Sequence, residues 1–85
     1  MNDTEKVLVA IQVPAINEVY DIFLPLYSQI YEVLELIKRA VNLLSQGLYK
    51  ADEGGILCDA AGEILNINMS VDELEIHNGS KLMLI

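Results

Sequence analysis

Two stretches of alternating apolar residues, closely followed by one stretch of helical periodicity, constrain the fold of this chain most. The first alternating stretch covers residues 7–13 and the second covers residues 19–24, and both are rich in β-branched or aromatic side chains. Alternation with a period of two predicts strands. Pro14 ends the first strand and Pro25 the second, because proline has no N–H to donate to a neighbouring strand. The short gap at residues 15–17 predicts a hairpin.

The helical stretch predicts one long amphipathic helix from Ser28 to Gln46. Ser28 is the expected N-cap, and Gly47 is expected to close the helix in a left-handed conformation. Glu35 is expected to pair with Lys38 and Arg39 on the solvent side. The inward stripe comprises Ile30, Val33, Leu34, Ile37, Val41 and Leu44, and the opposite side carries Glu32, Glu35, Lys38, Arg39, Asn42 and Gln46.

The remaining residues predict short strands at 56–58, 63–65 and 81–85, joined by turns. A connection at residues 48–55 carries Asp52 and Glu53, residues 70–74 resemble one helical turn capped by Ser70, and residues 77–80 contain an Asn-Gly turn. A hairpin, a long helix, short strands and a last strand predict an α+β fold, a mixed sheet with the helix packed across one face. The last strand is expected beside the first, in parallel.

Composition limits the classes of protein to which the chain can belong. Its 85 residues are expected to form a single domain, 1–85, and 53% hydrophobic residues argue against disorder. The net charge of −8 makes nucleic acid and anionic membranes poor partners. The apolar runs are too short to span a membrane. One cysteine and an acidic start, Met1 to Glu5, without a signal peptide predict a cytoplasmic protein.

The end of the chain carries a family resemblance. Residues 70–85, with a short turn, an apolar anchor, a polar turn and a last strand, resemble the end of ubiquitin-like domains, which have the β-grasp fold. Residues 20–25 (YDIFLP) followed by the helix are similar to YukD/EsaB-type proteins. These are small cytoplasmic ubiquitin-like components of Gram-positive type VII secretion systems. The resemblance implies a non-catalytic accessory or regulatory role, with secretion-apparatus proteins as partners.

The last residues suggest a difference from ubiquitin itself. Ubiquitin and the sulfur-carrier proteins end in a flexible Gly-Gly tail, and their terminal carboxylate is activated by adenylation. This chain ends at Leu84-Ile85, within the last expected strand. An isoleucine carboxylate at a sheet edge would not enter an activating enzyme. We therefore expect that the protein is not conjugated to others.

The residues that could carry chemistry favour no catalytic, cofactor or metal site. Cys58 has Leu57 and Asp59 as its neighbours and no cationic residue beside it, so it is expected to be an ordinary strand residue. His77 is the only histidine and lies in an expected exposed turn. The acids at 72, 73 and 75 lack the spacing of a calcium loop, and Gly54-Gly55 lacks the lysine of a phosphate loop.

The apolar surface suggests protein binding instead. If alternate residues face the helix, the far side of the sheet carries Leu8, Val19, Phe23, Met83 and Ile85. Solvated strand faces usually carry polar residues, so this set predicts a contact face, which we expect to be ringed by acids. Leu36 and Leu43 lie outside the main helix stripe. They are expected either to pack under the 48–55 connection or to meet a partner helix.

The sequence leaves two alternatives open. The apolar sheet faces of two copies could pair in a two-fold homodimer. The chain could also be a ubiquitin-like accessory subunit of a bacterial multicomponent di-iron monooxygenase, with the iron ligands on another chain. Neighbouring genes would separate the second alternative from a secretion component, because one predicts a hydroxylase and a reductase and the other a secretion ATPase.

Overall fold

The two alternating stretches form the predicted hairpin. A computed structural model describes residues 5–51 and 54–85, so the predictions that concern Asp52, Glu53 and the first four residues lie outside the described residues. Strand β1 (Lys6–Val13) pairs antiparallel with β2 (Glu18–Pro25), and the 3-10 turn η1 (Pro14–Ile16) joins them. Asn17 closes this connection at φ 55°, a left-handed conformation that asparagine tolerates better than most residues.

The predicted helix is present but begins later than expected. Helix α1 spans Ile30–Leu44, and its N-cap is Gln29. The backbone N–H of Gln29 donates to the Glu32 carboxylate at 3.4 Å. The prediction of Ser28 as the cap is wrong, because Ser28 belongs to the preceding turn, where its carbonyl accepts from the N–H of Val71 at 3.1 Å. After the helix, Gln46 and Gly47 both have positive φ, so the closure begins one residue earlier than predicted.

Two residues of α1 differ from their predicted environments. Lys38 was expected in solvent but is only 3% exposed, with its ammonium 3.3 Å from Glu35. Gly55 packs against this side chain: at φ +119°, a Cβ added to its backbone would lie 3.1 Å from Lys38 Cδ. Leu44 was expected in the core but is 54% exposed, because the helix ends there.

The mixed sheet also forms as predicted. Strand β4 (Lys81–Leu84) pairs in parallel with β1, and β3 (Leu57–Asp59) pairs antiparallel with β4, which gives the order β2-β1-β4-β3. The strand expected at 63–65 is reduced to one bridge between Cys58 and Ile64. The side chain of Asp59 accepts the N–H groups of Ala61 and Glu63, both at 2.9 Å, and this tight turn leaves little length for pairing.

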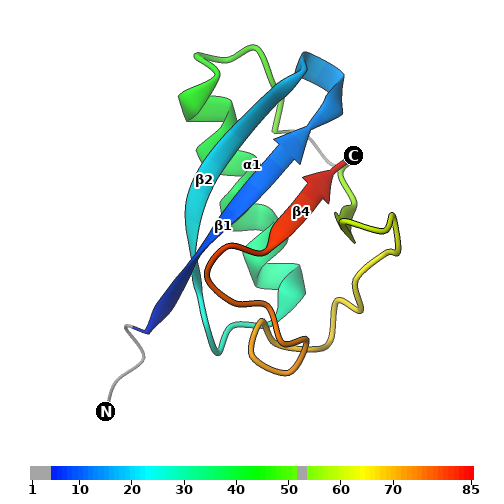
Figure 1. Cartoon of the computed structure of the whole chain (residues 1–85). Coiled ribbons are helices and arrows are strands. Elements are labelled where there is room, and N and C mark those ends of the chain that lie inside the picture. The colour runs from blue at the N-terminus through cyan, green and yellow to red at the C-terminus, as the bar shows by residue number, and fades with distance from the viewer. Residues whose placement is uncertain (1–4, 52–53) are drawn as a thin grey trace.

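The hydrophobic core lies between the sheet and α1, which crosses one face of the sheet (Figure 1). Its residues come from both halves of the chain. The buried members are Val7, Val9, Ile11, Val13, Ile22, Leu24, Ile30, Val33, Ile37, Val41, Leu57, Val71, Ile76, Leu82 and Leu84.

Candidate functional site

The outer face of the sheet, opposite α1, carries the side chains that were predicted to face outward. Val19 and Phe23 are each 59% exposed, Leu8 and Ile85 are exposed, and Met83 is half-buried. The alternate residues of β1 and β4 are buried under α1. The predicted facing of the strands is therefore confirmed.

Strand register divides this outer face into rows that the sequence did not reveal. In the first row Phe23 lies opposite Leu8, and we call this apolar couple the Leu8–Phe23 pair. In the middle row Ala10 lies between Asp21 on β2 and Lys81 on β4. In the last row Gln12 lies between Val19 on β2 and Met83 on β4. The apolar residues thus form two groups separated by a polar row.

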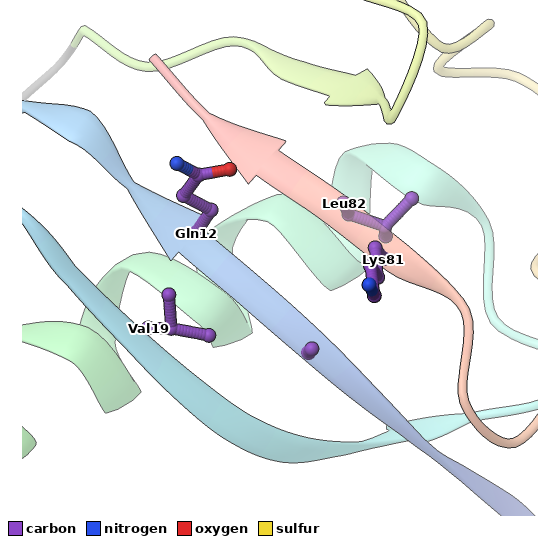
Figure 2. A pocket seen from close by; sticks show the side chains of 5 residues that line it. Gln12, Val19, Lys81 and Leu82 are labelled. Carbon is purple, nitrogen blue, oxygen red and sulfur yellow. The ribbon is translucent and has the colours of Figure 1, made fainter.

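A shallow hollow of about 240 Å³ lies on this face, where the small side chain of Ala10 leaves space. Figure 2 shows Gln12, Val19 and Lys81 around it, on neighbouring strands. Lys81 lines the hollow, and Asp21 lies on the other side of Ala10 in the same row, so the face carries opposite charges on its two outer strands. The face therefore suits a partner that offers both apolar and charged groups.

The expected ring of acids around the face is wrong in one respect. Asp21 is acidic, but Lys6 and Lys81 share the same face, since side chains two residues apart on a strand point to the same side. Most of the acidic residues lie on α1 and in the later turns. The face itself therefore carries both signs of charge, with Asp21, Lys6 and Lys81 on it.

The predicted helix flank separates into two different environments. Leu36 is half-buried and packs against the core, whereas Leu43 is 76% exposed near the end of α1. The two leucines therefore do not pack against the same part of the protein. Among the described residues of this connection, Gly55 packs against the aliphatic chain of Lys38.

A second apolar surface was missed in the sequence. Ile56, Ile64 and Ile67 are exposed around a hollow of about 140 Å³ between the start of α1 and residues 55–67. Its floor contains Ile30, Leu34 and Leu57 as well as Gly55 and Leu65. The signal in the sequence was the pair of isoleucines at 64 and 67.

The cysteine, the histidine and one of the acids that the sequence offered for chemistry are buried in a strand or hydrogen-bonded within a turn. Cys58 is buried in β3, beside Met83. The Nδ1 atom of His77 lies 2.9 Å from the carbonyl oxygen of Asn78 in an exposed turn, and the Ser80 hydroxyl accepts the N–H of His77. The Glu73 carboxylate accepts the N–H of Ser70, and the Ser70 hydroxyl accepts the N–H of Glu73, so this acid closes the predicted turn.

The described residues show neither a metal-binding cluster nor a helix that could span a membrane. Within residues 5–51 and 54–85, no group of three or more His, Cys, Asp or Glu side chains is placed to hold a metal ion. In the same part of the chain, no helix is both long enough and apolar enough to cross a bilayer.

The hydroxyl of Tyr27 donates to the Glu5 carboxylate at 2.8 Å, and this bond ties the start of β1 to the turn after β2. The hydrogen bond, together with the negative charge of Glu5, raises the pKa of Tyr27 above its ordinary value. Both groups are exposed, so the contact lies at the surface.

Solved structures of similar shape give the comparison with known proteins. The chain matches the EccD5 ubiquitin-like domain from Mycobacterium xenopi with a TM-score of 0.81 and 23% identity, over 95% of this chain and 93% of that chain. It matches the ubiquitin-like domain of the Mycobacterium tuberculosis type VII secretion system protein EccD1 with a TM-score of 0.78 and 14% identity, over 96% and 99% of the two chains.

A third match extends the comparison to a larger assembly. A chain of the MycP5-free ESX-5 inner membrane complex matches with a TM-score of 0.78 and 19% identity, over 94% of this chain and 20% of that one. No protein-family model and no curated protein sequence matches the chain. The sheet order, the position of α1 across the sheet and these structural likenesses together show that the chain has the ubiquitin-like β-grasp fold.

Proposed function

We propose that this chain is a non-catalytic protein-interaction module and a cytoplasmic accessory component of a type VII secretion system. The observation that carries the proposal is the likeness to the EccD5 ubiquitin-like domain, with a TM-score of 0.81 over nearly the full length of both chains. The sequence resemblance to YukD/EsaB-type proteins supports the same context. In this proposal residues 1–85 act as one domain, and the partners are other proteins of the apparatus.

The mechanism is docking through the outer face of the sheet. The Leu8–Phe23 pair and Val19 expose apolar area that a partner would remove from water, at roughly 25 cal/mol per Å². The charge of −8 would attract a basic partner surface and speed the encounter. The polar row at Asp21, Ala10 and Lys81 would fix the orientation of the partner.

The test is capture of partners from the native host with the protein tagged at its N-terminus. The proposal expects a secretion ATPase or membrane component of the type VII apparatus among the captured proteins. A double variant, Val19→Lys with Phe23→Lys, should lose them, because it puts two charges into the contact without touching the core. Ile64→Lys is the matched control, because Ile64 is similarly exposed, at 68%, on another surface.

Three results would contradict the proposal. Capture of a hydroxylase and a reductase would favour the accessory subunit of a di-iron monooxygenase. Capture of the type VII components by the double variant, with circular dichroism unchanged, would show that the outer face is not the interface. Loss of capture in Ile64→Lys alone would move the interface to the surface around Ile56 and Ile67.

A further inference from the structure

Strand β2 forms an open edge of the sheet. It has eight residues, Glu18–Pro25, and stands at the end of the order β2-β1-β4-β3. Within the described part of the chain, β1 is the only strand that pairs with it. An edge strand of this length presents a row of backbone donors and acceptors that another strand can use.

The hydrogen bonds of β1 show which residues of β2 supply that row. The N–H of Leu8 donates to the Asn78 side chain at 2.7 Å, its carbonyl accepts from Gly79 at 2.9 Å, and the N–H of Ala10 donates to Ser80 at 2.9 Å. The even-numbered residues of β1 therefore direct their backbone groups towards the β4 side. Because this direction alternates along a strand, the odd-numbered residues of β1 direct theirs towards β2.

The register then assigns the residues of β2. Val7, Val9 and Ile11 lie opposite Leu24, Ile22 and Tyr20, so these β2 residues use their backbone groups on β1. The backbone groups of the residues between them point to the open edge: Val19, Asp21 and Phe23. The side chains of the same three residues lie on the outer face, where all are exposed. The edge thus offers backbone pairing together with an apolar, acidic, apolar side-chain pattern.

We propose that the β2 edge accepts an extended partner segment as an added antiparallel strand whose outer-facing side chains read apolar, basic, apolar. The basic residue lies opposite Asp21, and its apolar neighbours lie beside Val19 and Phe23, as in cross-strand pairs. This inference rests on the proposed function of the outer face as the interaction surface and defines how the partner chain lies on it.

Charge selects this occupant over a second copy of the protein. Strand β2 carries Glu18 and Asp21 and has no lysine or arginine, so pairing of two β2 edges offers no basic side chain to Asp21. Each copy also brings a net charge of −8. Proteins often protect sheet edges with lysine or proline, and here Pro25 stands only at the end of the strand. The middle of the edge therefore has neither the lysine nor the proline that would oppose pairing with a basic extended segment.

The test measures amide hydrogen exchange by NMR, with and without a synthetic peptide, Gly-Thr-Val-Thr-Arg-Thr-Val-Thr-Gly, blocked at both ends. In the free protein the amides of Tyr20, Ile22 and Leu24 should exchange slowly and those of Val19, Asp21 and Phe23 quickly. Saturating peptide should slow exchange at the second set at least several-fold. A matched peptide with glutamate in place of arginine should bind more weakly.

Two pairs of variants separate the charge from the backbone contact. Asp21→Lys should lower the affinity for the arginine peptide about two- to fivefold and raise the affinity for the glutamate peptide by a similar factor. This is the size of effect that one cross-strand charge pair produces. Glu63→Lys, at a distant exposed acid, is the control for net charge. Val19→Pro removes one outward N–H and should weaken binding more than Val19→Ala, which keeps it. Circular dichroism checks that each variant is folded.

Each of the remaining outcomes overturns the strand-addition proposal. Shift changes on the outer face without slower exchange at Val19, Asp21 and Phe23 would show docking without an added strand and would leave the proposed function intact. Equal binding of both peptides would remove the role of Asp21. If the edge amides exchange more slowly as the protein concentration rises, in the absence of peptide, the edge would pair with a second copy of the protein. Absence of binding by the arginine peptide at millimolar concentration would also overturn it.

Discussion

Residues 6–44 fold into two strands of eight residues and a helix of fifteen, whereas the described residues 45–51 and 54–85 contain strands of three and four residues joined by turns. Both regions place fully buried side chains in the same core, for example Ile37 from the first and Val71 from the second. The first region directs its core residues inward by the regular period of strand and helix. The second has no comparable period.

Polar side chains replace regular structure in the second region. Asp59, Ser70 and Ser80 each accept backbone N–H groups within their own turns. Asn78 does so across the chain, by accepting the N–H of Leu8 at the start of β1. The comparison shows that a short, irregular segment can position core residues when side chains satisfy the backbone groups that a longer strand would have paired.

The largest expected effect tests whether the two regions share one core. Ile37→Ala in α1 and Ile76→Ala in the second region should each lower the free energy of unfolding by about 2–5 kcal/mol, as large-to-small core changes do. Arg39→Ala, on the exposed side of α1, should change it by less than about 0.5 kcal/mol. Urea unfolding measures all three. A loss confined to Ile37→Ala would mean that the second region unfolds separately.

The next effect concerns Lys38, which joins the two regions beneath Gly55. Lys38→Ala removes buried methylene groups and should lower stability by about 1–3 kcal/mol, at about 0.8 kcal/mol per group. Lys38→Met keeps most of the aliphatic chain and should cost less than half as much. If both variants cost the same in thermal melts, the ion pair with Glu35 matters more than the packing.

A smaller effect compares the two serines that sequence reasoning proposed as caps. Ser70→Ala should lower stability by about 1 kcal/mol, because its hydroxyl accepts the N–H of Glu73 at 3.0 Å. Ser28→Ala should change it by a few tenths, because Gln29 is the N-cap of α1. Urea midpoints of the two variants check this. An equal loss in both would restore Ser28 as a cap and contradict the comparison.

The smallest effect is a change of pKa in the first region. Glu5→Gln removes the carboxylate that Tyr27 contacts, so the raised pKa of Tyr27 should fall towards the ordinary value of about 10. Any stabilisation from this bond is present below the unfolded-state pKa and disappears as the pH rises through the raised folded-state pKa. NMR titration of the Tyr27 ring measures the shift. An unchanged pKa in Glu5→Gln would exclude the hydrogen bond.

The sequence predicted most of the first region and the class of the fold. Periods of two and 3.6 identified the hairpin, the helix and their inward faces, because such periods appear wherever one side of an element is buried. The outward set Leu8, Val19 and Phe23 followed from the same alternation. Turn residues at 70–74 and 77–80 were also predicted, since their hydrogen bonds are local. A role of the outer face in binding stays a prediction.

The features that only the tertiary structure determines depend on contacts between residues that lie far apart in the sequence. The side chain of Lys38 packs beside Gly55, seventeen positions away. Strand register placed Ala10 between Asp21 and Lys81 and divided the apolar face, which no local pattern could indicate. Alternation determines which way a side chain points, but its neighbours across the sheet are set by the pairing of strands that lie far apart in the sequence.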